Sequence, residues 1–436
     1  MTLLIISPDY ASHLFPLATL GTAWQEAGER VVVASGPATA DIVRAFGFER
    51  ENLQLGRGSN PGVIRADAQP RGEDDTLRGF FAATRLGMVQ TLRFQAEARS
   101  NDLLWNPVQI AREVQRLVER IRPDQVIVDH LAFAARLGLV AAGVRHADVV
   151  LGHPSALPVL GEVYGYPPEW PRAFRPDVED LAALRLLCET VRDSFTAQWN
   201  AALRELDPLA EPSVDAFRET GDVLLLNYPA ELHSAARSKL LPDHDFLGSA
   251  VRSEDDDAEV DDWLGTGTEP VVYVSFGSFL SVRGDVLGRV VAALRDLPVR
   301  VALATGSTDP AALGPVPPGW LVRGFLPQVR LLEESVLAVS HGGNNSVTEA
   351  MTAGVPLLLL PFSTDQFAGA AALDSAGFGE SLDPNSASIG EIRAAAGRLL
   401  NLAGEPRGRL DRLRVSLSGG AGPRRAFEAL TAVRVG

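Results

Sequence analysis

The sequence predicts an α/β protein built from two Rossmann-like halves, each a parallel sheet with helices on both faces. Short runs of β-branched and aliphatic residues alternate with longer stretches in which Leu and Ala recur at helical spacing. One series of runs covers residues 3–7, 31–35, 125–129, 148–152 and 222–227, and a second covers 271–276, 300–304, 321–323, 337–340 and 355–361. Strands that alternate with helices form β-α-β units and hence parallel sheets. The second series therefore predicts a second sheet.

Length and composition agree with two globular domains. A chain of 436 residues is too long for one ordinary core. Its net charge of −15 argues against nucleic acid or an anionic membrane as a partner, because phosphate-rich surfaces are bound through basic side chains. The longest apolar run, residues 355–361, is far shorter than the ~20 residues of a membrane span. The first residues lack the basic and apolar regions of a signal peptide, and Cys188 is the only cysteine, so we expect a cytoplasmic protein.

Residues 248–262, between the two series, are polar and acidic and predict a solvated interdomain linker. Within them, Asp255, Asp256 and Asp257 are similar to the Asp-x-Asp element that holds a divalent metal in other sugar transferases. That element normally closes a buried strand, whereas these aspartates stand in a hydrophilic run. We therefore assign them to the linker and predict no metal site.

A histidine and an aspartate are expected at one edge of the first sheet. His13 follows the first strand in a loop, and a helix is predicted over residues 16–27 because proline at position 16 suits the first turn. Asp129 closes the strand that ends at the same edge, where open α/β sheets bind their ligands. A histidine oriented by a carboxylate serves as a general base, so we predict a His13/Asp129 catalytic dyad. His130 points the other way along the strand and is the weaker candidate.

The densest group of glycine and polar residues lies in the second half, between Gly324 and Gln366. A strand ends at His341, and a helix begins near Asn344 after two glycines. The free amide groups and positive end of such a helix form an anion site. Glu349 lies one turn further on, where a carboxylate accepts both hydroxyls of a ribose. The order of these residues predicts a cradle for a nucleotide diphosphate.

Taken together, these motifs resemble the nucleotide-sugar signature of family 1 glycosyltransferases, the group of plant and animal UDP-glycosyltransferases and bacterial antibiotic and macrolide glycosyltransferases. The similarity rests on Gly324-Phe325-Leu326-Pro327-Gln328, His341-Gly342-Gly343, Asn345-Ser346 with Glu349, Gly354-Val355-Pro356 and Asp365-Gln366. Residues 271–278 match the strand that opens the family's donor domain. His13 with Pro16, and Asp129, match its catalytic positions. Residues 50–120 and 153–220 match nothing specific, as expected of an acceptor domain.

The resemblance implies a GT-B fold, in which two Rossmann-like domains face a central cleft. It implies an acceptor-binding domain over residues 1–247, a linker over 248–262, a nucleotide-sugar-binding domain over 263–415 and a C-terminal helix, 416–436, that crosses back to the first domain. Phe325 would stack on the base, Gln328 would hold the nucleoside and Glu349 the ribose. The diphosphate would contact Ser278, His341, Gly342, Gly343, Asn345 and Ser346, and the sugar hydroxyls would contact Asp365 and Gln366.

The implied reaction is an inverting hexosyl transfer in which His13 deprotonates an acceptor hydroxyl. Helix dipole, backbone amides and His341 would stabilise the departing diphosphate, so we expect a metal-independent enzyme without a cofactor, the nucleotide sugar being a co-substrate. Glu349 favours UDP-glucose or UDP-N-acetylglucosamine, because thymidine has no 2′-hydroxyl. A thymidine-linked deoxysugar stays open as an alternative donor, since Phe325 and Asn344 depart from the residues common in the family.

Aromatic residues gather in the two stretches that interrupt the alternation, 52–106 and 153–200. Aromatic side chains in long insertions often line an apolar pocket. We expect such a pocket to hold a small-molecule acceptor, a partly apolar natural product, between Phe80, Phe81, Phe94, Tyr164, Tyr166 and Trp170. Local packing of the inserted helices is the alternative explanation.

Three rival classes share parts of this pattern. A nicotinamide dehydrogenase would need Gly-x-Gly-x-x-Gly after the first strand, and residues 7–16 do not contain it. A UDP-sugar 2-epimerase has the same fold and stays open. A catalytically silent sugar-nucleotide-binding protein is less consistent with the pairing of His13 and Asp129.

Overall fold

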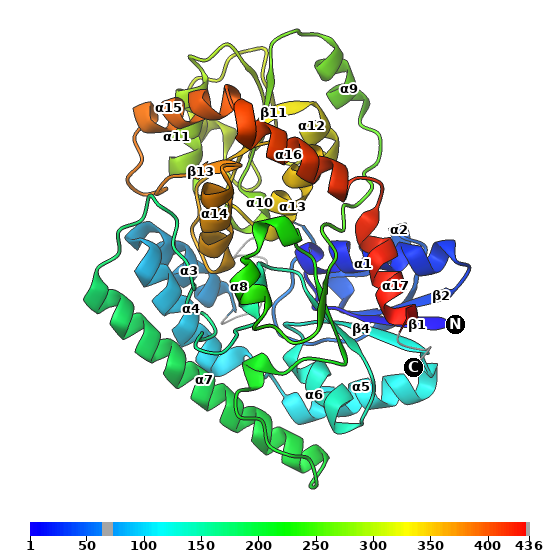
Figure 1. The fold of residues 1–436 in the computed structure, drawn as a ribbon. Helices are drawn as coiled ribbons and strands as arrows, with labels where there is room; N and C mark the ends of the chain where they lie inside the picture. The colour runs from blue at the N-terminus through cyan, green and yellow to red at the C-terminus, as the bar shows by residue number, and fades with distance from the viewer. Residues whose placement is uncertain (63–72, 433–436) are drawn as a thin grey trace.

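The computed structural model describes residues 1–62 and 73–432, which form two domains, each a parallel sheet between helices (Figure 1). Within these residues the first sheet has the strand order β3-β2-β1-β4-β5-β6-β7 and the second β10-β9-β8-β11-β12-β13. Every strand pair in both sheets is parallel. The predicted α/β class with two Rossmann-like halves is confirmed.

In the first domain the strands are β1 (Thr2–Ile6), β2 (Arg30–Ser35), β3 (Glu49–Asn52), β4 (Gln125–Asp129), β5 (Ala147–Val150), β6 (Val223–Leu226) and β7 (His244–Phe246). Its helices are α1 (Ala11–Glu26), α2 (Ala40–Ala45), α3 (Glu73–Leu86), α4 (Met88–Asp102), α5 (Pro107–Ile121), α6 (Phe133–Ala141), α7 (Val178–Leu206) and α8 (Ala235–Ser238).

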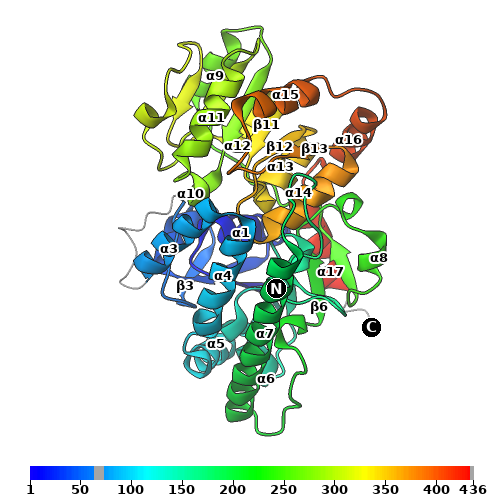
Figure 2. The same cartoon turned by 90° about the vertical axis from the view of Figure 1, so that its left-hand side faces the viewer.

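In the second domain the strands are β8 (Val271–Ser275), β9 (Arg300–Ala304), β10 (Leu321–Arg323), β11 (Ser335–Ser340), β12 (Leu357–Leu359) and β13 (Gly379–Ser381). The helices are α9 (Ala258–Gly265), α10 (Gly277–Leu280), α11 (Gly284–Leu294), α12 (Gln328–Glu334), α13 (Asn344–Ala353), α14 (Asp365–Ala376), α15 (Ile389–Leu400) and α16 (Gly404–Leu417), while α17 (Ala421–Ala432) packs on the first domain. In Figure 2 this domain lies above the first, with α1 and α14 near the junction.

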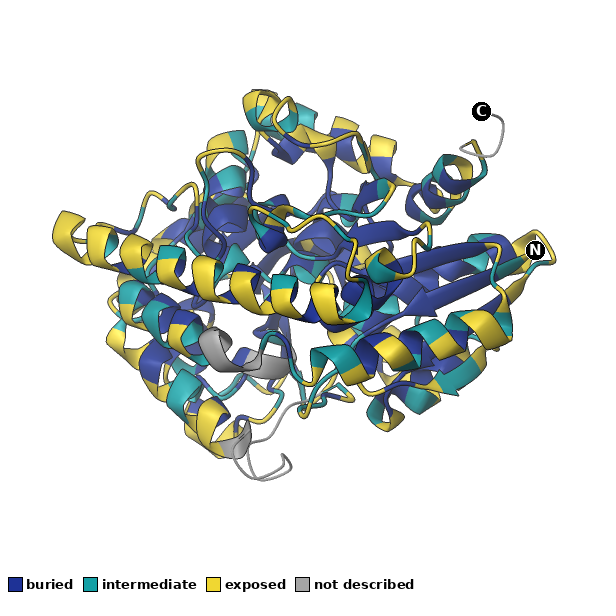
Figure 3. Ribbon diagram, turned by 90° about the horizontal axis from the view of Figure 1, so that it is seen from below, coloured by how far each residue is buried: buried dark blue, intermediate teal, exposed yellow. Residues whose placement is uncertain are grey.

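The central strands are apolar and buried, whereas the outer strands are not. Leu3, Leu4, Ile5 and Ile6 are fully buried, and Figure 3 shows buried strands behind helices whose outer faces are exposed. Three strands that the sequence did not predict, β3, β7 and β13, each lie at a sheet edge. They are short and mostly polar, which is how edge strands avoid pairing with other chains. Hydrophobic patterning therefore could not find them.

Helix α1 begins five residues before the predicted position, at Ala11, and Pro16 lies inside it. The expectation of Pro16 at the first helical position and of His13 in a loop is thus wrong. A proline inside a helix removes one N–H bond to the residue four positions earlier, here the carbonyl of Ser12. That carbonyl accepts a hydrogen bond from Asn345 Nδ2 instead, at 2.8 Å. His13 is consequently held in the first turn of a helix, with a fixed backbone.

The chain ends on the first domain. Helix α17 packs along α1, where the rings of Trp24 and Phe427 meet edge to face with centroids 5.1 Å apart. Gln125 Nε2 donates to the Leu430 carbonyl at 3.0 Å, and Gln125 Oε1 accepts from Trp24 Nε1 at 2.6 Å. The last described helix is therefore part of the first domain's core. No helix among the described residues is long and apolar enough to cross a bilayer.

Candidate active site

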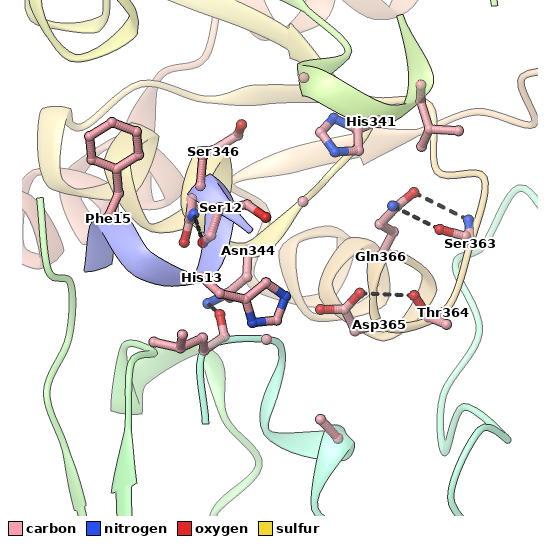
Figure 4. A pocket seen from close by; sticks show the side chains of 18 of the residues that line it. Ser12, His13, Phe15, His341, Asn344, Ser346, Ser363, Thr364, Asp365 and Gln366 are labelled. Atoms are coloured by element: carbon pink, nitrogen blue, oxygen red, sulfur yellow. Dashed lines mark hydrogen bonds between the residues drawn. The ribbon is translucent and has the colours of Figure 1, made fainter. Parts of the chain in front are cut away.

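A cleft of about 570 Å³ lies where the carboxyl ends of the two sheets face each other. It receives residues from both domains, among them His13, Asp129, His341 and Asp365. Figure 4 shows His13, His341 and Asp365 around a common space. The structure thus brings the two groups of residues predicted from the sequence into one site.

His13 and Asp129 form a hydrogen-bonded pair. The distance from His13 Nδ1 to Asp129 Oδ2 is 2.7 Å. The Asp129 side chain is only 1% exposed, whereas that of His13 is 27% exposed. The second carboxylate oxygen of Asp129 accepts from the Leu131 backbone N–H at 2.8 Å, which fixes the carboxylate. With Nδ1 bonded to the carboxylate, Nε2 is the ring nitrogen left to exchange a proton with a ligand.

The charge of Asp129 tunes this imidazole. Burial disfavours the protonated ring, but the charge and hydrogen bond of Asp129, helped by the charge of Asp365, raise the pKa of His13 above its ordinary value of 6.5. A raised pKa makes the imidazole a better proton acceptor. The arrangement is that of a base oriented by a buried carboxylate.

Across the cleft, the backbone turns sharply between β11 and α13. Gly342 has φ +82°, a conformation that glycine adopts without strain. The next glycine, Gly343, packs on the imidazole of His341, and a Cβ there would lie 2.5 Å from its Nε2. Burial lowers the pKa of His341 to about 4, so the ring is neutral at pH 7. Its Nδ1 has no hydrogen-bond partner among the described residues.

These features at the start of α13 are chemically suited to an anion. The backbone amides of a helix N-terminus attract negative charge, and a neutral imidazole in the Nδ1–H or Nε2–H form donates one hydrogen bond without adding a buried charge. Ser346 lines the cleft beside them, and Gly342 does not. The side chain of Ser278, predicted to contact the same anion, lies outside the described residues.

The nucleoside end of the predicted donor site is more crowded than the sequence indicated. Phe325 is 65% exposed and lines the cleft, as a stacking platform would. Glu349, in contrast, is 5% exposed and does not line the cleft. Its Oε1 accepts from Arg252 at 2.7 Å, and its Oε2 accepts from Gln328 Nε2. Arg252 and Gln328, which both line the cleft, therefore separate this carboxylate from it.

Arg252 is a cleft residue that the sequence reasoning missed, because it lies in the segment interpreted as a solvated linker. It bonds Glu349 and, at 2.8 Å, Glu254, and it stacks over the Phe15 ring with its guanidinium carbon 5.4 Å from the centroid. Glu254 in turn accepts from the N–H groups of Gln328, Val329 and Arg330, the first turn of α12. Asp255 and Asp256, by comparison, are exposed as expected of a linker. The one feature of the sequence that could have indicated this role is that Arg252 is the single basic residue in the acidic segment 248–262.

The residues predicted to hold the sugar also have protein partners. Asp365 Oδ2 accepts from the His153 backbone N–H at 3.1 Å. Gln366 folds back on its own loop, where its Oε1 accepts from the Phe362 and Ser363 N–H groups. Thr364, which directly precedes Asp365 in the chain, has φ 34°, a strained conformation for a residue with a Cβ. Both predicted residues line the cleft, with Asp365 the one that reaches toward the first domain.

Three of the six aromatic residues predicted to form the acceptor pocket line the cleft: Phe80, Tyr164 and Tyr166. The other three, Phe81, Phe94 and Trp170, do not line it. Phe81 lies beside Phe80, Phe94 covers Gly79, and Trp170 packs toward Phe367 of α14. These rings serve the local packing that was the alternative explanation.

The chain is similar to known glycosyltransferases. A family model described as UDP-glucoronosyl and UDP-glucosyl transferase matches residues 183–403. The chain is 32% identical over 127 residues to the NDP-glycosyltransferase YjiC of Bacillus subtilis, a match over 29% of this chain and 32% of that protein. It is 26% identical to the demethyllactenocin mycarosyltransferase of Streptomyces fradiae over 96% of this chain and 84% of that one.

A solved structure of the spinosyn rhamnosyltransferase SpnG complexed with thymidine diphosphate superposes with a TM-score of 0.66 at 20% identity, covering 98% of this chain and 100% of that one. A likeness of this kind establishes the fold, and the GT-B architecture is confirmed.

The dyad geometry predicts how the protonation of His13 depends on its partner. Asp129→Asn removes the negative charge that raises the pKa of His13, while the burial that lowers this pKa remains. The pKa of His13 should therefore fall from above 6.5 in the wild type to below 6.5 in the variant. The measurement is an NMR titration of the imidazole Cε1 proton, assigned by comparison with His13→Gln. An equal pKa in both proteins would show that Asp129 does not set the charge state of His13.

Proposed function

The chain belongs to the UDP-glucoronosyl and UDP-glucosyl transferase family, and on this premise we propose that it is an inverting hexosyltransferase acting on a hydroxyl of a small natural product, with a UDP-sugar as donor. The observation that carries the proposal is the position of the His13/Asp129 pair, across one cleft from the anion site at α13. The proposed base and the proposed leaving-group site thus line one cleft from different domains, so that an acceptor and a donor bound there could meet.

In the proposed reaction, His13 Nε2 takes the proton from the acceptor hydroxyl as its oxygen attacks the anomeric carbon. The bond from that carbon to the diphosphate oxygen breaks, and the nucleoside diphosphate leaves. Asp129 stabilises the imidazolium that forms, while the amides of α13 and the neutral His341 donate to the developing phosphate charge. Attack from the side opposite the leaving group inverts the configuration at the anomeric carbon.

Support for the acceptor class comes from the cleft wall and from the relatives. Phe80, Tyr164 and Tyr166 give the acceptor side an apolar surface, and aromatic walls with a few polar groups are typical of small-molecule sites. The mycarosyltransferase named above modifies demethyllactenocin by its name. We therefore propose a partly apolar natural product as acceptor.

A thymidine-linked sugar is the second candidate donor, and one observation favours it. Both oxygens of Glu349 already accept hydrogen bonds from Arg252 and Gln328, so a donor without a 2′-hydroxyl forgoes little there. SpnG, whose fold this chain shares, was solved with thymidine diphosphate.

His13→Ala should lower kcat by about 10²-fold or more. Binding of UDP should change little, because His13 belongs to the first domain and the proposed anion site to the second. Steady-state kinetics and calorimetry with UDP separate the two effects. A loss of UDP affinity as large as the loss of kcat would make His13 a binding residue.

Turnover should persist in excess EDTA. The helix N-terminus at Asn344 and the neutral His341 offer the diphosphate positive potential and hydrogen-bond donors, which is the task that a divalent ion performs elsewhere. The assay compares initial rates with EDTA, with Mg²⁺ and with Mn²⁺. Activity that vanishes with the chelator and returns with either ion would refute the proposed stabilisation.

The donor assignment predicts an unequal response to Glu349→Ala. A uridine donor offers two ribose hydroxyls and a thymidine donor one, so kcat/KM should fall by about ten- to a hundredfold for the UDP-sugar, about 1–3 kcal/mol, and by less for the TDP-sugar. Glu349→Ala also deprives Arg252 of a hydrogen-bond partner, and this change affects both donors equally. The measured quantity is therefore the loss of kcat/KM for the UDP-sugar divided by the loss for the TDP-sugar. Equal losses would show that Glu349 does not read the 2′-hydroxyl, and a wild type that prefers the TDP-sugar would favour the second candidate.

A further inference from the structure

The first two residues of α13 bind backbone carbonyls of the other domain. Asn344 is 9% exposed, and its Nδ2 donates to the Leu151 carbonyl at 2.6 Å and to the Asn227 carbonyl at 3.0 Å. Both hydrogens of the amide are used. Leu151 and Asn227 directly follow β5 and β6, so these are carbonyls at the edge where the first sheet meets the cleft. A buried carbonyl at such an edge needs a donor, and the second domain supplies it.

Asn345 makes the matching contact on the helix that carries the base. Its Nδ2 donates to the Ser12 carbonyl at 2.8 Å, next to His13 in the chain. The helix itself cannot serve that carbonyl, because the residue four positions later is Pro16, which has no N–H. The interior proline thus leaves an acceptor at the cleft end of α1, and the second domain binds it.

These three bonds join the anion-binding helix to both parts of the first domain that matter for the proposed reaction: the sheet edge and the turn that contains His13. Figure 4 shows Ser12, His13 and Asn344 together at this point. Their consequence is geometric, because transfer requires the base and the anomeric carbon at a fixed separation, and an error of about 1 Å costs about 10²-fold in rate.

We propose that Asn344 and Asn345 are positioning residues that set the separation between His13 and the donor sugar by fixing α13 to the first domain. This inference rests on the proposed function. It also reassigns Asn345, which the sequence resemblance made a ligand of the diphosphate. The two assignments differ in what the residue controls: a diphosphate ligand controls donor affinity, whereas a positioning residue controls the rate at saturating donor.

The test uses Asn345→Ala and Asn344→Leu, the latter of similar size but without donors. With either variant we expect kcat at saturating donor and acceptor to fall at least tenfold and the Kd of UDP, measured by calorimetry, to stay within threefold. The matched control is Asn401→Ala, since Asn401 Nδ2 also donates to a backbone carbonyl, that of Gly397 at 2.7 Å, but within its own helix end. This control should leave both quantities unchanged.

A Kd of UDP that weakens in step with kcat would overturn the inference and restore the diphosphate role, and an unchanged kcat would overturn it as well. Hydrogen–deuterium exchange supplies a readout that needs no turnover. The peptide containing residues 11–16 should exchange faster in Asn345→Ala than in the wild type, because the first turn of α1 loses its tie, and equal exchange would contradict the tie. If the wild type transfers no sugar, the proposed function is contradicted. Faster exchange of residues 11–16 in Asn345→Ala would still support the contact between the two domains.

Discussion

The hydrogen bond between His13 and Asp129 is the contact on which the arrangement of the cleft depends. It joins the first turn of α1 to the end of β4, two elements 116 residues apart in the chain. A carboxylate that is 1% exposed is stable only with partners, and Asp129 has the imidazole on one oxygen and a backbone N–H on the other. The bond therefore stabilises the sheet edge and orients the base at the same time.

The second domain completes the site by contacts that a single Rossmann-like unit could not make. Asn344 and Asn345 reach backbone carbonyls beside the dyad, Asp365 binds the N–H of His153, and Arg252 connects the interdomain segment to Glu349. Each of these polar groups has a partner across or along the domain junction. The proposed donor would compete with some of these contacts, above all at Glu349, so the proposal predicts that donor selectivity depends on the junction as well as on the signature residues.

The sequence sufficed for the fold and for the two halves of the site because each depends on local pattern. Apolar runs identified the buried strands. The geometry of parallel sheets placed His13 and Asp129 at one edge of the first sheet and His341 at the carboxyl edge of the second. The short edge strands escaped notice because they contain few apolar residues, as Glu49–Asn52 shows. Because of Pro16, the start of α1 was predicted too late. The proline leaves the Ser12 carbonyl without a donor in the helix, and the donor that replaces it, Asn345, lies more than three hundred positions away in the chain.

Side-chain pairing was the part that pattern could not provide. The position of Glu349 in the sequence does not show that its carboxylate is hydrogen-bonded to Arg252. Likewise, the clustering of aromatic residues does not distinguish Tyr166, which lines the cleft, from Trp170, which packs on α14. Such distinctions depend on contacts between distant segments.

The stereochemistry of transfer tests the central claim most directly, because the proposed single displacement by a hydroxyl that His13 deprotonates requires inversion. The measurement is proton NMR of the glycoside formed from UDP-α-glucose, or from the corresponding TDP-sugar, and an acceptor found by screening small natural products. The account predicts the β-glycoside as the sole initial product and its loss in His13→Ala. An α-glycoside would contradict it, because retention of configuration is incompatible with a single displacement by a hydroxyl that His13 deprotonates.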